Sequence, residues 1–313
     1  MAPIYARMAV IGCGLIGSSV VRAARESGAA ASIVVADASE AARARIVDLG
    51  IADAVHADGR DAVRGADLVI FCTPVGVIGA AAGMVRDALA PGATLTDVGS
   101  CKASVAEAMI AAAPDDAFVI PGHPVAGTEQ SGPDAGFATL FRNRWTLLCP
   151  GDDPRPEYGA AVERLTAFWE RLGAQVETMD ARHHDLVLAV TSHLPHLIAY
   201  NIVGTAADLE EVTQAEVMKF SAGGFRDFTR IAASDPTMWR DVFLENKDAV
   251  LEILGRFTED LQALSRAIRW GEGDKLFELF TRTRDIRRQL IALGQESAEP
   301  NFGRDRGSSV PPA

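Results

Sequence analysis

Hydrophobic and polar positions follow two different periods in the two halves of the chain. From Met8 to about Cys149, short β-branched runs alternate with Ala-rich amphipathic stretches, the pattern of β-α-β units on a parallel sheet. The runs that predict strands are 8–12, 32–37, 66–73, 93–99, 117–122, 145–150 and 174–180. The pattern therefore predicts a doubly wound α/β domain with a parallel sheet over residues 1–180.

Beyond Asp180 the strand pattern ends, and apolar residues recur at helical spacing from Ala181 to Leu293. We expect an all-helical second domain over residues 181–294. Helices that are apolar on more than one face need a partner surface, which a second copy of the same domain commonly supplies, so we expect a homodimer. Residues 295–313 are rich in Gly, Ser, Pro and charge and are expected to form a disordered tail.

Composition narrows the class of protein. The formal net charge of −12 over 313 residues argues against a nucleic-acid partner, because it repels a phosphate backbone. We find neither a signal-peptide core nor an uninterrupted apolar run of about 18 residues, so we expect a cytoplasmic protein without membrane contact. The four cysteines lack CxxC spacing and are expected to be reduced thiols without a metal, with Cys101 the one open to oxidation.

A GxGxxG motif follows the first predicted strand and opens a helix, the context in which this motif binds a dinucleotide. Its residues are Gly12, Cys13, Gly14, Leu15, Ile16 and Gly17. Gly12 permits the tight turn, Gly14 admits the pyrophosphate, and Gly17 lets helix and strand pack closely. Asp37 ends the second predicted strand, where a carboxylate binds the ribose hydroxyls of NAD and repels the 2′-phosphate of NADP. We therefore expect NAD as the cofactor.

Thr73 and Pro74 follow the third predicted strand and are expected to line the cofactor trough near the nicotinamide. A Thr-Pro pair after a strand is also an ordinary turn. The alternative for the whole motif is a glycine-rich turn without a ligand, with Asp37 as a solvated strand end.

His123 follows a predicted strand at the carboxyl edge of the sheet, where ligands of open α/β folds bind. A neutral imidazole can accept a hydroxyl proton while hydride leaves the same carbon. The alternative is a histidine that only caps the Pro-Gly-His-Pro turn. Ser100 follows the fourth predicted strand, where it suits either a ligand contact or a helix N-cap. Lys102, two residues further on, either adds positive potential for an anionic substrate or is an exposed, solvated lysine.

Three further blocks carry a resemblance to a known family: GHPVAGTEQSG at 122–132, SHLPH at 192–196, and GGFRDFTRIAASDPTMWRDVFLENK at 223–247. Through them the chain, from about Met8 to Leu293, resembles the prephenate and arogenate (cyclohexadienyl) dehydrogenases of tyrosine biosynthesis. The resemblance implies NAD-dependent oxidative decarboxylation of prephenate, arogenate or both, giving 4-hydroxyphenylpyruvate or tyrosine. It also implies that His123 accepts the hydrogen bond of the ring hydroxyl and that Ser100 touches this hydroxyl.

Both substrates carry two carboxylates, so the site needs fixed cations. Arg230 is the candidate for bidentate carboxylate binding, with Arg226 nearby. We expect Arg230 to hold the side-chain carboxylate, because an ion pair to the departing carboxylate would stabilise the ground state. By resemblance Glu129 acts as a gate or tunes pH dependence, and Gln130 distinguishes keto from amino side chains.

His193 and His196 lie three residues apart, with a proline between them that is expected to kink the helix. This spacing can hold zinc, but no third ligand is evident and hydride transfer needs no Lewis acid, so we expect no metal. By resemblance His196 contacts the substrate, whereas His193 fits a buried structural histidine equally well. Trp239 is expected to pack near the site, beside a helix that starts at Pro236.

Two other functions are compatible with a dinucleotide-binding domain followed by a helical domain. A β-hydroxyacid or imine-type dehydrogenase has the same two-domain plan, since a fold does not set its chemistry. A non-catalytic NAD-sensing protein would lack the base or the anion-binding arginine. The blocks at 122–132 and 223–247 argue against both alternatives.

Overall fold

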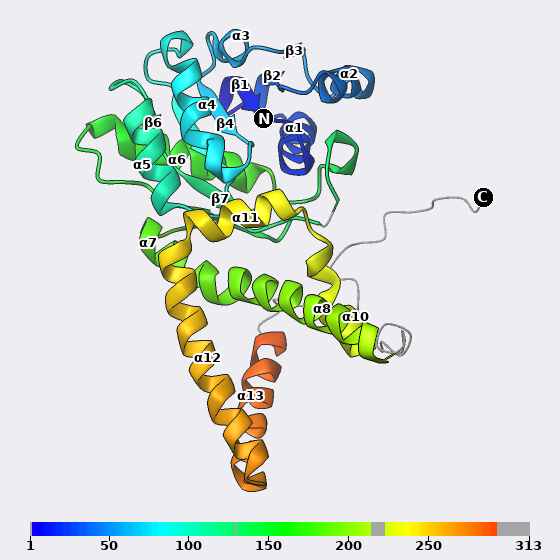
Figure 1. Cartoon of the computed structure of the whole chain (residues 1–313). Coiled ribbons are helices and arrows are strands. Elements are labelled where there is room, and N and C mark those ends of the chain that lie inside the picture. Colours follow the sequence, from blue (N-terminus) through cyan, green and yellow to red (C-terminus); the bar gives the residue numbers. More distant parts are fainter. Residues whose placement is uncertain (1, 129, 214–222, 293–313) are drawn as a thin grey trace. The chain divides into compact units, whose positions relative to one another are not determined.

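The computed structural model describes residues 2–128, 130–213 and 223–292 (Figure 1). The chain divides into two compact units, residues 1–253 and 254–313. The division falls inside helix α12 (Lys247–Arg269). The compact units therefore differ from the domains expected from the change of pattern at residue 180.

Six parallel strands form the main sheet of the first unit, in the order β3-β2-β1-β4-β5-β6. They are β1 (Tyr5–Ile11), β2 (Ala30–Ala36), β3 (Ala54–His56), β4 (Leu68–Phe71), β5 (Thr94–Asp97) and β6 (Phe118–Val119). Ile11 pairs with both Ala36 and Phe71, and Phe71 pairs with Asp97, so four strands end on one line. The strand order reverses between β1 and β4, and ligands of doubly wound folds bind at this point.

A second, three-stranded sheet corrects the sequence prediction. The predicted strands at 145–150 and 174–180 do not join the main sheet. They form β8 (Trp145–Leu148) and β9 (Gln175–Thr178), which are parallel, and β7 (Gly122–Pro124) pairs antiparallel with β8. His123 therefore lies within a short strand rather than after one. The pattern also does not predict β3, which is too short for alternation to be recognised.

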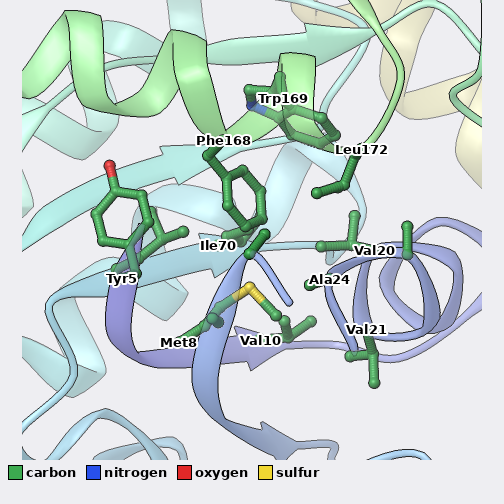
Figure 2. Close-up of a cluster of buried hydrophobic side chains, with 14 of the residues drawn as sticks. Tyr5, Met8, Val10, Val20, Val21, Ala24, Ile70, Phe168, Trp169 and Leu172 are labelled. Atoms are coloured by element: carbon green, nitrogen blue, oxygen red, sulfur yellow. The ribbon is translucent and has the colours of Figure 1, made fainter. Parts of the chain in front are cut away.

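Helices cover both faces of the main sheet and bury it in two hydrophobic clusters. Along β1, Met8 and Val10 point into one cluster, whereas Ala9 and Ile11 point into the other. Figure 2 shows the first cluster, in which Phe168, Trp169 and Leu172 pack over β1 and helix α1. The helices of this part are α1 (Leu15–Ser27), α2 (Glu40–Leu49), α3 (Gly59–Val63), α4 (Ile78–Val85), α5 (Ala103–Ala112) and α6 (Pro156–Arg171). Short 3-10 turns are η1 (Val75–Val77), η2 (Arg86–Ala88) and η3 (Pro133–Ala135).

The rest of the first unit is helical, and the described residues after Thr178 contain no strand, as the pattern predicts. The elements are α7 (Ala181–Leu188), the π-helical turn η4 (Ala189–His193), α8 (Leu194–Thr213), α10 (Gly223–Thr229), η5 (Arg230–Ala233) and α11 (Pro236–Glu245). Asp180 caps α7 and Asp235 caps α11 through side-chain hydrogen bonds to backbone N–H groups. The turn that precedes Pro195, η4, is π-helical, and such turns are frequent at functional sites.

The helical run Ala181–Leu209 is long and apolar enough, by length and composition alone, to cross a membrane. No such stretch was expected from the sequence, because polar residues interrupt the apolar run. This helix carries three buried polar side chains, His184, Asp185 and His193, which hydrogen-bond to other parts of the first unit.

The second compact unit contains the end of α12 and helix α13 (Gly273–Ala292). A turn joins them, in which Gly271 adopts a left-handed φ of 65°. Large apolar side chains of this unit are exposed, namely Leu261, Ile268, Trp270, Phe277, Phe280 and Ile286. The expected disordered tail at 295–313 lies outside the described residues.

Candidate active site

The glycine motif occupies the turn between β1 and α1, at the point where the strand order reverses. A Cβ atom on Gly12, whose φ is 88°, would lie 2.9 Å from the Cys72 carbonyl oxygen, and one on Gly17 would lie 2.2 Å from the Gly12 carbonyl oxygen. A Cβ on Gly14 would meet nothing within 4 Å. Packing of the chain therefore requires Gly12 and Gly17, whereas Gly14 faces open space that a pyrophosphate can enter.

Leu15 and Ile16 begin helix α1, and no side chain caps its first backbone N–H groups. Uncapped amides at a helix N-terminus bind phosphate well, because the helix dipole favours an anion there. The turn therefore has the features that a pyrophosphate needs.

Asp37 follows β2 and is fixed by its neighbours. Its carboxylate accepts hydrogen bonds from the backbone N–H of Cys13 at 2.8 Å and of Ser39 at 2.9 Å. Arg43 donates to the carbonyl oxygens of Asp37 (2.8 Å) and Ala38 (2.9 Å), so a guanidinium from six residues further along the sequence lies beside Asp37. Each carboxylate oxygen keeps a further lone pair for a ribose hydroxyl.

Thr73 and Pro74 follow β4, across the crevice from Asp37. The methyl group of Thr73 would lie 3.1 Å from a Cβ on Gly12, which places this side chain against the glycine turn. Its hydroxyl is buried without a hydrogen-bond partner among the described residues. Such an unsatisfied group at a cofactor crevice fits a polar ligand atom.

His123 lies in β7 and is only 6% exposed. Its Nδ1 is 2.9 Å from Nε2 of His184. Burial lowers the pKa of His123 well below its usual value, and the nearby His184, Lys102 and His193 lower it further. His123 is therefore neutral at physiological pH, the state that a proton acceptor requires.

Lys102 neither faces solvent nor adds free positive potential for a substrate, which corrects both expectations for it. It is fully buried and forms an ion pair with Asp97, and its Nζ also donates to the Gly122 carbonyl oxygen at 2.8 Å. Asp97 in turn accepts from the backbone N–H of Gly99 at 2.7 Å and of Gly122 at 3.1 Å. The pair thus ties β7, which carries His123, to the end of β5.

Ser100 is half-buried after β5, but it does not cap the following helix. Helix α5 begins at Ala103, and its first N–H groups are bound by the side chain of Asp185 on α7. Lys102 N donates to Asp185 Oδ1 at 2.7 Å, and Ala103 N donates to Asp185 Oδ2 at 2.9 Å. The Ser100 hydroxyl is thus not required for capping. The sequence pattern gave no sign of Asp185, because the cap comes from more than 80 positions away.

His196, His193 and Trp239 form an aromatic cluster. The Trp239 ring stacks on His196 with centroids 3.6 Å apart and meets His193 edge-on at 6.1 Å. His196 Nδ1 is 2.8 Å from the Ser192 carbonyl oxygen, so this nitrogen carries the proton and Nε2 is an acceptor. Asn246 Nδ2 lies 3.0 Å from His193 Nδ1. Trp239 Nε1 is buried without a hydrogen-bond partner among the described residues. His193 Nε2 has no described partner of full hydrogen-bond geometry, but the backbone of Ser100 is close enough to the imidazole to act against the lowering of its pKa by burial.

Of the remaining candidates among the described residues, only Arg230 is tied to this cluster. Arg230 is exposed on η5, and the pKa of His196 is lowered first by burial and then by the charge of Arg230, so the two are close. Arg226 is exposed on α10, and Gln130 is exposed in the loop after β7. Glu129 lies outside the described residues.

The cysteines offer no reactive site in the described part of the chain. Cys101 is fully buried, burial raises the pKa of its thiol, and its Sγ lies 3.5 Å from the Val242 carbonyl oxygen. The expectation that Cys101 is open to oxidation is therefore wrong. Among the described residues, no group of three or more His, Cys, Asp or Glu side chains could hold a metal ion.

Known proteins match the chain along nearly its whole length. Family models described as "Prephenate dehydrogenase, nucleotide-binding domain" and "Prephenate dehydrogenase, dimerization domain" match residues 20–178 and 180–282. A cyclohexadienyl dehydrogenase of Zymomonas mobilis is 42% identical over 92% of this chain and 97% of its own length. A prephenate dehydrogenase of Bacillus subtilis is 32% identical over 93% and 77%, respectively.

A solved structure also matches. The crystal structure of a prephenate dehydrogenase from Aquifex aeolicus in complex with hydroxyphenyl propionate and NAD+ has a TM-score of 0.84 and 31% identity to this chain. The match covers 91% of this chain and 98% of that chain.

Proposed function

The chain belongs to the prephenate dehydrogenase family, and from this membership we infer that it is an NAD-dependent oxidoreductase acting on prephenate, arogenate or both. The reaction is an oxidative decarboxylation that gives 4-hydroxyphenylpyruvate from prephenate or tyrosine from arogenate. The observation that carries the proposal is the neutral, buried His123, which the Asp97–Lys102 pair holds beside the end of β5, on the line where β1 and its glycine turn also meet.

The cofactor position is supported by the residues at the β1–β4 crevice. NAD, when bound, accepts the hydride from the ring carbon that bears the hydroxyl. We assign the pyrophosphate to the turn at Gly12, Gly14 and Gly17 with the first amides of α1, and the ribose hydroxyls to Asp37. The unpaired hydroxyl of Thr73 suits the nicotinamide end.

His123 is the proposed proton acceptor. Its Nδ1 faces His184, which leaves Nε2 to accept the proton of the ring hydroxyl as hydride departs from the same carbon. Ser100, which is free of a capping role, is proposed to hydrogen-bond the same hydroxyl and orient it.

The substrate carboxylates are assigned by charge. Arg230 suits the side-chain carboxylate, which stays on the product, and Arg226, four residues earlier in the sequence, is the second candidate. The buried Nε2 of His193 and Nε1 of Trp239 are neutral donors and suit the ring carboxylate, since they bind it without the ion pair that would hold back its loss. His196 completes this side through its stacking on Trp239.

The assembly is proposed to be a homodimer of cytosolic chains. The match of residues 180–282 to a dimerization domain and the exposed apolar side chains of the second unit support the dimer. The net charge of −12 and the buried polar side chains on 181–209 favour the cytosol over a membrane.

We propose residue 180 as the boundary between the dinucleotide-binding and helical domains, because β9 ends at Thr178.

The test is a set of turnover assays with NAD and, separately, prephenate, arogenate and a 3-hydroxy acid. We expect NADH and carbon dioxide in equal amounts from at least one of the first two and none from the third. Turnover of the 3-hydroxy acid alone would indicate a β-hydroxyacid dehydrogenase. NAD binding by calorimetry without turnover of any of the three would indicate a sensor, and either result would overturn the proposal.

A further inference from the structure

Three side chains from two distant segments form a hydrogen-bonded chain that ends at the proposed base. Asp185 Oδ1 lies 2.9 Å from His184 Nδ1, and His184 Nε2 lies 2.9 Å from His123 Nδ1. Both residues of α7 are buried, with His184 fully inaccessible and Asp185 4% exposed. The roles proposed above for the substrate site do not use His184 or Asp185.

Asp185 is held as a carboxylate. Burial alone would raise its pKa, but hydrogen bonds from His184 and from the backbone of Ala103 and Lys102 outweigh burial and lower it. The two backbone donors belong to the N-terminus of α5, whose dipole also favours a negative charge. An ionised carboxylate can only accept hydrogen bonds.

The protonation states of His184 and His123 follow from that carboxylate. Because Asp185 only accepts, His184 Nδ1 must carry a proton, and in neutral His184 the other nitrogen, Nε2, is then an acceptor. The partner nitrogen, His123 Nδ1, must therefore carry a proton. Neutral His123 consequently has its lone pair on Nε2, the atom that faces no hydrogen-bond partner among the described residues.

We propose that His184 and Asp185 are positioning residues that fix His123 in the Nε2-acceptor tautomer and receive the proton that His123 takes up. This inference rests on the proposed function. In the step, the substrate O–H bond breaks and a proton joins His123 Nε2, while the Nδ1 proton of His123 passes to His184 Nε2. The three side chains together gain one proton and no electrons. The positive charge therefore ends on His184, beside the Asp185 carboxylate.

The surroundings favour His184 as the final position of the charge. The groups that face His123 are His184, the ammonium of Lys102 and His193, and each disfavours a positive charge there. His184 faces Lys102 as well, but it also faces the carboxylates of Asp185 and Asp97, which offset part of the effect of burial. The hydrogen bond and the charge of Asp185 act to raise the pKa of His184, whereas His184, Lys102 and His193 all act to lower the pKa of His123.

The variant His184→Gln separates orientation from proton uptake. The glutamine carbonyl oxygen can still accept a hydrogen bond from His123 Nδ1–H, but it cannot take up that proton. We expect kcat to fall by about 10-fold or more with KM within about 2-fold, since only part of the general-base contribution is lost. In the wild type the proton taken up by the pair rests on His184 beside the Asp185 carboxylate, and His184→Gln removes that position. The acid limb of the kcat profile, which belongs to the pair, should therefore move to lower pH by about one unit.

The neighbouring His183 supplies the matched control. Its side chain is exposed on the same helix, so His183→Gln should leave kcat and the pH profile unchanged. NAD affinity, measured by calorimetry, should match wild type in both variants, which distinguishes a lost relay from a damaged fold. If wild type turns over neither prephenate nor arogenate, the proposed function fails first.

A second readout does not depend on turnover. The chain has only six histidines, so long-range ¹H–¹⁵N spectra of the ¹⁵N-histidine protein can assign their tautomers. We expect Nδ1–H for both His123 and His184 at neutral pH. An Nε2–H tautomer at His123, or a His184→Gln variant with wild-type kcat and an unmoved acid limb, would overturn the proposal.

Discussion

The variant Lys102→Met tests how strongly the buried ion pair behind the active site stabilises the first compact unit. Both side chains of the pair are fully inaccessible, and Lys102 also donates to the Gly122 carbonyl oxygen. Methionine fills much of the lysine stem but leaves the Asp97 carboxylate with only the backbone donors of Gly99 and Gly122. Removing one partner of a buried pair typically costs about 3–5 kcal/mol, because the other charge stays buried and unpaired.

The loss should depend on pH with a definite sign. Burial raises the pKa of Asp97 above its usual value, and Lys102 opposes that rise. Without Lys102 the folded-state pKa rises further above that of the unfolded chain. The folded protein then binds more protons than the unfolded chain between the two pKa values, so its stability falls as pH rises and recovers as pH falls. We expect the deficit against wild type to be smaller near about pH 5 than near about pH 8.

Urea unfolding, followed by tryptophan fluorescence and circular dichroism, measures this deficit. The control is Arg60→Met, which breaks an ion pair with Asp58 whose side chains are 60% and 44% exposed. It should lower the free energy of unfolding far less than Lys102→Met does, because an exposed ion pair is screened by water and salt. The double variant Lys102→Met/Asp97→Asn should recover part of the loss, because the uncompensated charge is gone. A Lys102→Met deficit as small as that of the control, at every pH, would refute the reasoning.

Four further predictions concern the proposed site and assembly. His123→Asn should lower kcat by about 10²–10⁴ with a smaller change in KM, because a positioned base is lost, and an unchanged acid limb would contradict this. Arg230→Ala should raise KM by about 10-fold or more with little change in kcat, as expected for a lost charged hydrogen bond. Asp37→Ser should weaken NAD and improve NADP relative to it, since Arg43 already lies beside this position; a wild type that prefers NADP would contradict the assignment. Sedimentation at micromolar concentration should give twice the chain mass, and a value near 33.2 kDa would exclude the dimer.

The cofactor crevice could be predicted from the sequence because its determinants are local. The turn at 12–17 carries its own signal: two of its glycines are required by contacts within the turn and with the adjoining strand β4. Asp37 was assigned to the ribose from its distance along the chain to the motif, and that assignment stays a prediction. The all-helical character after residue 180 was likewise predicted from periodicity, which is a local property.

The second sheet could not be predicted, because the pattern shows strands but not their partners. The runs at 145–148 and 175–178 have ordinary strand composition, and only tertiary pairing decides that they join β7 rather than the main sheet. Lys102 was misjudged for a related reason. A lysine is almost never fully buried unless it is paired, and its partner Asp97 shows as a partner only when the loop after β5 folds back.

The pair His184–Asp185 was missed because its role joins three elements that are far apart in the sequence. One carboxylate both caps α5 and holds the proton of His184, while Asn246 donates to the backbone carbonyl oxygen of Asp185 at 2.8 Å. Docking of α7 against α5 and the tautomer of His123 therefore depend on the same side chain. A change at Asp185 would disturb both at once, whereas a change at His184 leaves the cap intact. For this reason a substitution at His184, rather than at Asp185, can separate proton transfer from folding.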